Sequence, residues 1–215
     1  KTKVIFIASP NNPTGTSKTL KEIKDFLNNM KDDILVFLDQ AYYEYIEGSE
    51  FDIPFSLIDD HPNLVISRSF SKAHGLAALR LGFCVSNPEL SDYLNRVRQP
   101  FNANSLALDL GKVALSDQEH ISKSVKINSS GMKRVKKAFT NFDYNFIESW
   151  GNFISFDAKQ DSDVAFQYFL EKGVILRSLK VYEMPQHLRV SIGTEEEMDF
   201  FLQVLEDYEK DLSKK

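Results

Sequence analysis

Three polar segments of this 215-residue chain carry side chains that could bind and transform a small molecule. Each comes at the end of a short apolar run: residues 9–15 follow the first run, Asp39 closes the second, and residues 67–72 end the third. In an open α/β sheet, ligands bind at the carboxyl ends of the strands. The three segments are therefore candidates for one binding site.

The third segment has the residues of a phosphate-binding loop that also holds a reactive amine. Ser69 and Ser71 supply hydroxyl groups, Arg80 supplies a guanidinium, and a helix N-terminus expected here would favour an anion. Lys72 lies among them, and its amine could attack a carbonyl group to form a covalent bond. The alternative is a solvated loop rich in serine and lysine.

The other two segments supply groups for the rest of such a ligand. Asp39 needs a partner, because an unpaired buried carboxylate is costly; the alternative is a helix N-cap. Asn11 and Asn12 lie in a loop that Pro10 and Pro13 stiffen, and the alternative is an ordinary turn. One ligand suits all three segments if it has a phosphate, a carbonyl group and a ring nitrogen. Pyridoxal 5′-phosphate (PLP) has all three.

The apolar pattern indicates which elements position these residues. Four β-rich apolar runs lie at residues 4–8, 34–38, 64–67 and 82–85. They are continuous rather than alternating, which is typical of strands buried on both faces of a parallel sheet. Apolar residues at helical spacing over residues 20–30 predict a helix between the first two strands. The first half is therefore predicted to be α/β, with a mostly parallel sheet.

The second half of the chain has a different pattern. It predicts a helix over residues 121–139, a strand pair over 146–156, a helix ended by Gly173, strands at 174–176 and 188–192, and a last helix opened by a capping box at 194–197. Helices mixed with a few strands are typical of an α+β domain. We expect residues 1–105 to belong to the first domain and residues 106–215 to an interdomain helix and the second domain.

Composition excludes several classes of protein. The formal net charge of −5 argues against a nucleic-acid partner or a membrane surface. A single cysteine, Cys84, excludes an intramolecular disulfide and a cysteine-based zinc site, and the four histidines lack ligand spacing, so no metal site is expected. No apolar run is long enough for a membrane span, and no signal peptide is visible. The composition is that of a cytoplasmic protein.

The motifs together resemble those of the fold-type-I PLP-dependent aminotransferases. The matching segments are SPNNPTG at 9–15, DQAY at 39–42, SFSKAHGLAALRLG at 69–82 and LRVSIGT at 188–194. Within the family, the segments at 42–45, 98–104 and 173–177 are most similar to those of the histidinol-phosphate aminotransferases. The resemblance implies a large PLP-binding domain followed by a small C-terminal domain.

The resemblance also implies a role for each matching residue. Lys72 would hold the cofactor covalently and later transfer a proton, while Asp39 would pair with the ring nitrogen. Asn12 and Tyr42 would hydrogen-bond the phenolic oxygen of the cofactor. Its phosphate would be bound by Ser69, Ser71 and Arg80. The anionic group of the substrate would be bound by Arg189, with Arg177 and Asn12 as further substrate contacts.

The implied reaction is transamination between histidinol phosphate and 2-oxoglutarate, which gives imidazole-acetol phosphate and glutamate in histidine biosynthesis. The expected partners are small molecules, namely an amino donor and a 2-oxo acid or phosphorylated substrate, together with a second copy of the chain in a homodimer. Alternatives on the same scaffold are an aromatic aminotransferase and a threonine-phosphate decarboxylase-like enzyme. A third alternative is a non-catalytic fragment.

The first residues give a further expectation. The chain lacks an initial Met and runs into the apolar segment 4–8 almost at once. We therefore expect it to be the C-terminal portion of a longer polypeptide, with an incomplete large-domain sheet and little or no activity by itself.

Overall fold

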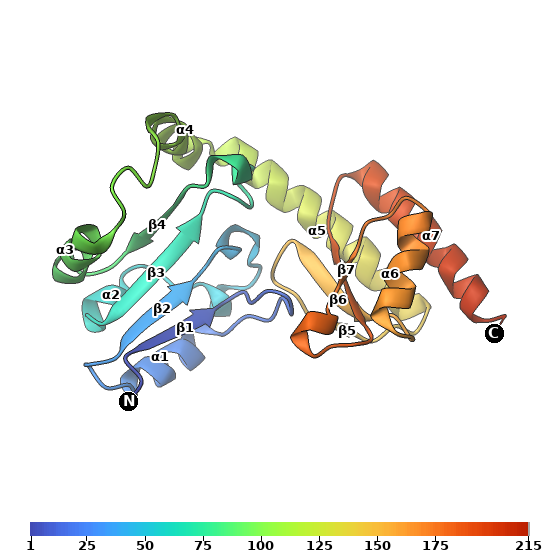
Figure 1. The fold of residues 1–215 in the computed structure, drawn as a ribbon, viewed down its shortest axis with the longest axis horizontal. Helices are drawn as coiled ribbons and strands as arrows, with labels where there is room; N and C mark the ends of the chain where they lie inside the picture. The colour runs from blue at the N-terminus through green and yellow to red at the C-terminus, as the bar shows by residue number, and fades with distance from the viewer. Residues whose placement is uncertain (215) are drawn as a thin grey trace. The chain divides into compact units, whose positions relative to one another are not determined.

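The computed structural model describes residues 1–214, which form two compact units (Figure 1). The first unit contains residues 1–11 and 17–123, and the second contains residues 12–16 and the chain from Ser124 onward. The short segment 12–16 therefore belongs to the second unit although it follows the first strand in sequence. The predicted division after residue 105 stays a prediction.

The first unit is built on a four-stranded sheet. Its strands are β1 (Val4–Ala8), β2 (Leu35–Asp39), β3 (Leu64–Ser69) and β4 (Gly82–Val85), in that spatial order. β1, β2 and β3 are parallel, as predicted, whereas β4 is antiparallel to β3. The connection into β4 explains this difference, because it is a loop with one short turn, η3 (Ala77–Leu79), and not the crossover helix that a parallel return requires.

One face of this sheet forms the core of the first unit. Helix α1 (Leu20–Asn28) begins with a capping box between Thr19 and Glu22 and buries Ile23 and Leu27. These two side chains belong to one buried cluster with residues of β2 and β3 and of the short helix α2 (Leu57–Asp60). The predicted helix at residues 20–30 is thus confirmed.

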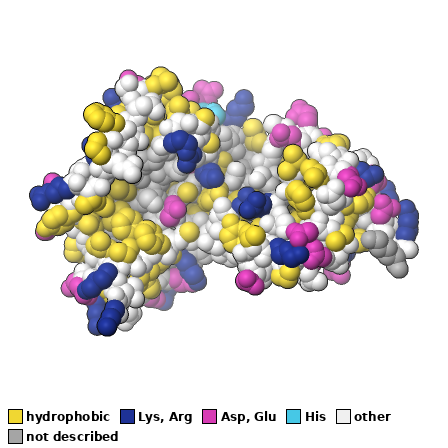
Figure 2. Space-filling model, in the orientation of Figure 1, with side chains coloured by type: hydrophobic (Ala, Val, Ile, Leu, Met, Phe, Trp, Pro, Cys, Tyr) yellow, Lys and Arg dark blue, Asp and Glu magenta, His cyan; other side chains and the backbone are white. Residues whose placement is uncertain are grey.

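The opposite face of the sheet is partly open. Phe6 on β1 is 76% exposed and stacks on Phe37 of β2, with 5.1 Å between ring centroids. Figure 2 shows hydrophobic side chains gathered over these strands. The prediction that the strands are buried on both faces is therefore wrong for β1, because within residues 1–214 the apolar cluster of this unit packs on the other face.

Several further helices complete the first unit. They are η1 (Tyr43–Tyr45), η2 (Ser49–Phe51), α3 (Pro88–Val97), α4 (Ser105–Ser116) and the start of α5 (Gln118–Asn141). Asn87 and Asn104 cap α3 and α4 by accepting hydrogen bonds from backbone N–H groups three residues on. Among the described residues, no helix has the length and apolarity needed to cross a bilayer.

The second unit packs three helices on an antiparallel sheet. The strands are β5 (Phe146–Ile147), β6 (Phe153–Asp157), β7 (Arg177–Ser178) and β8 (His187–Ser191), in the order β5-β6-β8-β7. Helix α6 (Ser162–Glu171), the turn η4 (Lys180–Tyr182) and helix α7 (Glu195–Leu212) follow the remainder of α5. The predicted α+β organisation and the capping box of Thr194 and Glu197 are confirmed. The strand predicted at 174–176 lies instead at 177–178.

The core of the second unit lies on one face of its sheet. Phe139 of α5 is fully buried, with its ring centroid 4.5 Å from that of Phe156 on β6. Ile154, Leu188 and Val190 belong to the same buried cluster. Because successive side chains of a strand alternate between faces, the residues between them point to the opposite face. Ser155 and Arg189 therefore share that second face.

Candidate active site

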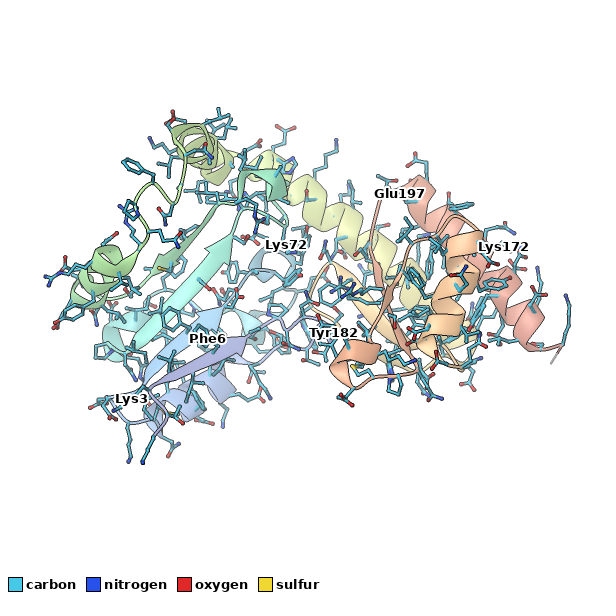
Figure 3. All side chains as sticks on the ribbon, in the orientation of Figure 1. Lys3, Phe6, Lys72, Lys172, Tyr182 and Glu197 are labelled. Carbon is cyan, nitrogen blue, oxygen red and sulfur yellow. The ribbon has the colours of Figure 1, made fainter. Side chains whose placement is uncertain are left out.

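The loop after β3 carries Lys72 in a closed turn (Figure 3). The backbone N–H of Gly75 donates to Lys72 O at 2.9 Å, and Gly75 has a φ of +72°, which favours glycine. His120 of α5 donates from Nε2 to the carbonyl oxygen of Ala73 at 3.1 Å. These contacts fix the backbone on both sides of the Lys72 side chain.

Lys72 lies close to Tyr42, the third residue after β2. The Nζ atom of Lys72 is 5.1 Å from the centroid of the Tyr42 ring, within the range of a cation–π contact. Tyr42 is 6% exposed and Lys72 is half-buried. Two of the residues predicted for one site are therefore brought together.

Asp39 occupies the end of β2, the strand next to the one that leads to Lys72. Its Oδ1 atom accepts hydrogen bonds from the backbone N–H of Ala41 at 3.0 Å and from the hydroxyl of Ser67 at 3.4 Å. Both bonds use one oxygen of a carboxylate that has two. The helix N-cap alternative is wrong, because Tyr42 is the N-cap residue of the next helix, η1.

The predicted phosphate-binding residues lie at the adjacent ends of β3 and β4. Ser69 is the last residue of β3, and its hydroxyl accepts from the backbone N–H of Ser71 at 3.0 Å. Ser69 pairs with Gly82 of β4, two residues beyond Arg80. Arg80 itself has a left-handed backbone with a φ of 53°, and its Nη1 donates to Ala77 O at 2.8 Å.

The helix N-terminus expected in this phosphate-binding loop is absent. Within the described part of the chain, residues 70–76 form bends and a turn, and the next helical element is the three-residue η3. A short 3₁₀ turn lacks the aligned peptide dipoles of an α-helix. Any anion binding in this loop therefore depends on hydroxyl groups and the guanidinium of Arg80.

The second unit brings Asn12 and Arg189 together. Nη1 of Arg189 donates a hydrogen bond to Oδ1 of Asn12, and the guanidinium lies 4.9 Å from the centroid of the Phe153 ring. The Nε atom of Arg189 is buried and has no hydrogen-bond partner among residues 1–214. Arg177 is the residue directly opposite Arg189 in the β7–β8 pair. Two guanidinium-bearing residues thus share one face of the sheet, an arrangement suited to anions.

A buried pair of a glutamate and a histidine in the first unit was not expected from the sequence. Nε2 of His74 lies 3.6 Å from Oε1 of Glu44, and the two side chains are 8% and 12% exposed. Burial raises the pKa of Glu44, while a backbone hydrogen bond and the neighbouring His74 and Arg68 side chains oppose that rise. The two residues lie thirty positions apart on different loops, and no local motif links them. Each stands two residues from a predicted site residue, Glu44 from Tyr42 and His74 from Lys72.

Comparison with known families and proteins gives a consistent result. A family model described as aminotransferase class I and II matches residues 1–205. Histidinol-phosphate aminotransferase 1 of Nitrosococcus oceani is 45% identical over 206 residues, covering 96% of this chain and 56% of that protein. Histidinol-phosphate aminotransferase 2 of Pseudomonas fluorescens is 48% identical over 204 residues, covering 95% and 55%. The chain thus spans about half the length of these relatives.

Solved structures share the fold. Histidinol-phosphate aminotransferase from Sinorhizobium meliloti, in complex with pyridoxal-5′-phosphate, superposes with a TM-score of 0.88 at 24% identity, over 97% of this chain and 58% of that one. The Clostridium acetobutylicum histidinol-phosphate aminotransferase superposes with a TM-score of 0.89 at 18% identity, over 97% and 64%. These likenesses establish that this chain has the fold of the matching part of those proteins.

Proposed function

Because this chain belongs to the class I and II aminotransferase family and has the fold-type-I architecture of its members, we propose that it takes part in PLP-dependent transamination. The observation that carries the proposal is the placement of an amine, a phenol and a carboxylate at or just beyond the carboxyl ends of two adjacent parallel strands. Lys72, Tyr42 and Asp39 are the three residues. We propose that all three contact the cofactor.

The donor set of the chain fits PLP group by group. Asp39 offers a carboxylate to the ring nitrogen, and its Oδ1 is already oriented by Ser67 and Ala41. The hydroxyls of Ser69 and Ser71 and the guanidinium of Arg80 are suited to a phosphate. Tyr42 and Asn12 offer donors to the phenolic oxygen of the cofactor. The buried Nε of Arg189 lacks a partner within residues 1–214, which suits a residue that receives an anionic substrate.

The chemistry divides between the cofactor and the chain. PLP supplies an electron sink when it is bound. Lys72 would hold the cofactor through its amine, and the same amine would accept and return the proton of the bound substrate. Asp39 keeps the ring nitrogen protonated, because a nearby carboxylate favours the charged form of a base. Arg189 orients the substrate through its anionic group, with Arg177 and Asn12 as further contacts.

We further propose that the substrates are histidinol phosphate and 2-oxoglutarate, which exchange an amino group to give imidazole-acetol phosphate and glutamate in histidine biosynthesis. The identities of 45% and 48% to two histidinol-phosphate aminotransferases support this choice. The phosphate group of such a substrate suits the opposed pair of Arg189 and Arg177. We also propose that the enzyme is cytoplasmic and that it is a homodimer. Sedimentation of the purified protein would test the homodimer, because it reports the mass of the particle.

Covalent capture of the cofactor tests the proposal directly. Purified protein is incubated with PLP, treated with borohydride and digested, and the peptides are examined by mass spectrometry. The expected result is a pyridoxyl group on Lys72 that is absent from the Lys72→Ala variant and retained in Lys112→Ala, an exposed lysine of α4. Modification of other lysines at equal yield in wild type and Lys72→Ala would contradict the proposal.

A further inference from the structure

Two backbone carbonyls attach residues 12–16 to strand β6 and to the turn that precedes it. The hydroxyl of Ser155 on β6 donates to Pro13 O at 2.6 Å, and the backbone N–H of Trp150 donates to Gly15 O at 2.9 Å. Pro13 and Gly15 are buried. A Cβ atom on Gly15 would lie 2.1 Å from the hydroxyl oxygen of Ser149, in the turn between β5 and β6, so only a glycine allows the segment to lie this close to the turn.

Ser155 is a fully buried hydroxyl on the face of the sheet away from the core. It is 0% exposed, although its strand neighbours Ile154 and Phe156 are the residues that point into the apolar core. A buried hydroxyl is costly unless it is hydrogen-bonded, so Ser155 requires an acceptor at this place. The carbonyl of Pro13 is that acceptor.

The same segment is also held by the strand next to β6. Ser155 stands directly opposite Arg189 in the β6–β8 pair, so both side chains leave the sheet on one face. Arg189 donates to the side chain of Asn12, while Ser155 donates to the carbonyl of Pro13. Two consecutive residues of the segment are therefore held by two cross-strand partners.

We propose that Ser155 is a positioning residue that holds the Asn12–Pro13 segment against β6 and thereby keeps Asn12 in contact with Arg189. Asn12 in turn occupies Nη1 of Arg189 and limits the orientations of the guanidinium. The guanidinium would then be presented to the substrate anion in a fixed direction. The binding of the substrate anion by Arg189 rests on the proposed function. The attachment of residues 12–16 through Ser155 does not depend on the proposed function.

The experiment uses Ser155→Ala, with Ser162→Ala as the matched control. Ser162 is also 0% exposed in the second unit, and its hydroxyl makes one side-chain contact, with Ser178 at 2.9 Å. Both variants remove one buried hydroxyl and one hydrogen bond. Thermal unfolding first establishes that each variant is folded. A loss of stability that both variants show is the general effect of removing a buried hydroxyl, and only the difference between the two variants is assigned to the contact of Ser155 with Pro13.

The first readout needs neither cofactor nor activity. Trp150 is the only tryptophan of the chain, and its backbone donates to Gly15 O. In Ser155→Ala, acrylamide quenching of Trp150 fluorescence should rise, because residues 12–16 lose the hydrogen bond to Pro13 O that helps to hold them. Quenching in Ser162→Ala should match that of wild type. Equal quenching in all three proteins would overturn the attachment, even if transamination were fully active.

The second readout concerns the substrate. Ser155→Ala should raise the KM for the amino-group donor about tenfold, the equivalent of one lost hydrogen bond, with kcat within about twofold of wild type. In a background of Asn12→Ala, the same substitution should have no further effect on KM, because Ser155 acts through Asn12. Additive losses in the double variant would overturn the positioning role. Absence of the pyridoxyl group from Lys72 of wild type in the borohydride experiment, with quenching as expected, would instead refute the proposed function alone.

Discussion

At the scale of single residues, the carboxylate of Asp39 is oriented by neighbours on its own sheet. Ser67, its partner across β2 and β3, and the backbone of Ala41 both donate to Oδ1. These hydrogen bonds limit the orientations of the carboxylate. Charged groups that are oriented before the reaction begins can contribute strongly to stabilising a transition state.

The charge of Asp39 should matter more for turnover than for substrate binding. Asp39→Asn keeps the acceptor oxygen for Ser67 and Ala41 but removes the negative charge. We expect kcat to fall by at least about 100-fold while KM changes much less. Steady-state kinetics with saturating PLP measure both constants, and Ser67→Ala, which loses one orienting bond, should give a smaller loss. Equal losses in kcat and substrate affinity for Asp39→Asn would contradict the prediction that the charge of Asp39 acts mainly on turnover.

The buried pair of Glu44 and His74 leads to a pH-dependent prediction. Burial raises the pKa of Glu44, so the folded protein binds this proton more tightly than the unfolded chain does. The resulting stabilisation is fully present below the unfolded-state pKa of about 4.3 and is lost as the pH rises through the higher folded-state pKa. Wild type should therefore lose stability relative to Glu44→Gln as the pH rises from about 4.3 towards neutrality.

Urea unfolding of both proteins across this pH range measures the difference. Glu47→Gln, on the exposed chain just beyond η1, is the matched control for the loss of one acidic residue. A difference between wild type and Glu44→Gln that stays constant with pH would show that Glu44 has the same proton affinity in both states.

At the scale of elements, helix ends are the features that local sequence determines most fully. The spacing of Thr194 and Glu197 predicts a capping box, and in the structure the hydroxyl of Thr194 accepts from the backbone N–H of Glu197 while the Glu197 side chain accepts from the backbone N–H of Thr194. All the groups involved lie within four residues of one another. The prediction therefore needed no knowledge of the rest of the fold.

Removal of this cap should weaken the second unit. Thr194→Ala is expected to lower the free energy of unfolding by about 1 kcal/mol, because it leaves the N–H of Glu197 without its acceptor. Thr194→Ser should retain most of the stability. Chemical denaturation followed by Trp150 fluorescence measures both, and a serine variant as unstable as the alanine variant would argue against the hydroxyl as the cause.

Strand direction and strand ends were less predictable, because they depend on contacts distant in sequence. The apolar run at residues 82–85 indicated a strand but not its antiparallel direction, which follows from the short connection after β3. In the same way, Val174 and Leu176 pack into the core before the strand pairing begins at Arg177. Apolar character identifies burial, but hydrogen-bond pairing is set by the neighbouring strand.

At the scale of the whole molecule, each unit has a core of its own. The second core is centred on Phe139, whose ring contacts those of Phe156, Tyr144 and Phe201. Phe139→Ala should lower the stability of this unit by about 3–5 kcal/mol through lost burial and a residual cavity, and Phe139→Leu should cost less. Unfolding curves from Trp150 fluorescence measure this loss. A change of under about 1 kcal/mol for the alanine variant would place the centre of the core elsewhere.

The sequence motifs indicated most of the candidate site, because the family resemblance rests on short segments whose residues lie in loops after predicted strands. Lys72, Tyr42 and Asp39 are examples, and their placement after β2 and β3 follows from the predicted parallel pairing. Ser155 and the pair of Glu44 and His74 were not predictable in this way. Their significance depends on partners far away in the chain, and a serine inside an apolar strand has no spacing that would reveal an acceptor 142 residues away.

The assignment of residues 12–16 to the second unit has a practical consequence for dissecting this protein. A gene segment that starts at Ser124 would encode the remainder of α5 and the later helices and strands of the second unit, but it would omit the five residues 12–16 of that unit. The hydroxyl of Ser155 and the peptide N–H of Trp150 would then lose the acceptors they have in the intact chain. A fragment that contains only the second unit should therefore include residues 12–16, joined to the chain from Ser124 onward by a linker.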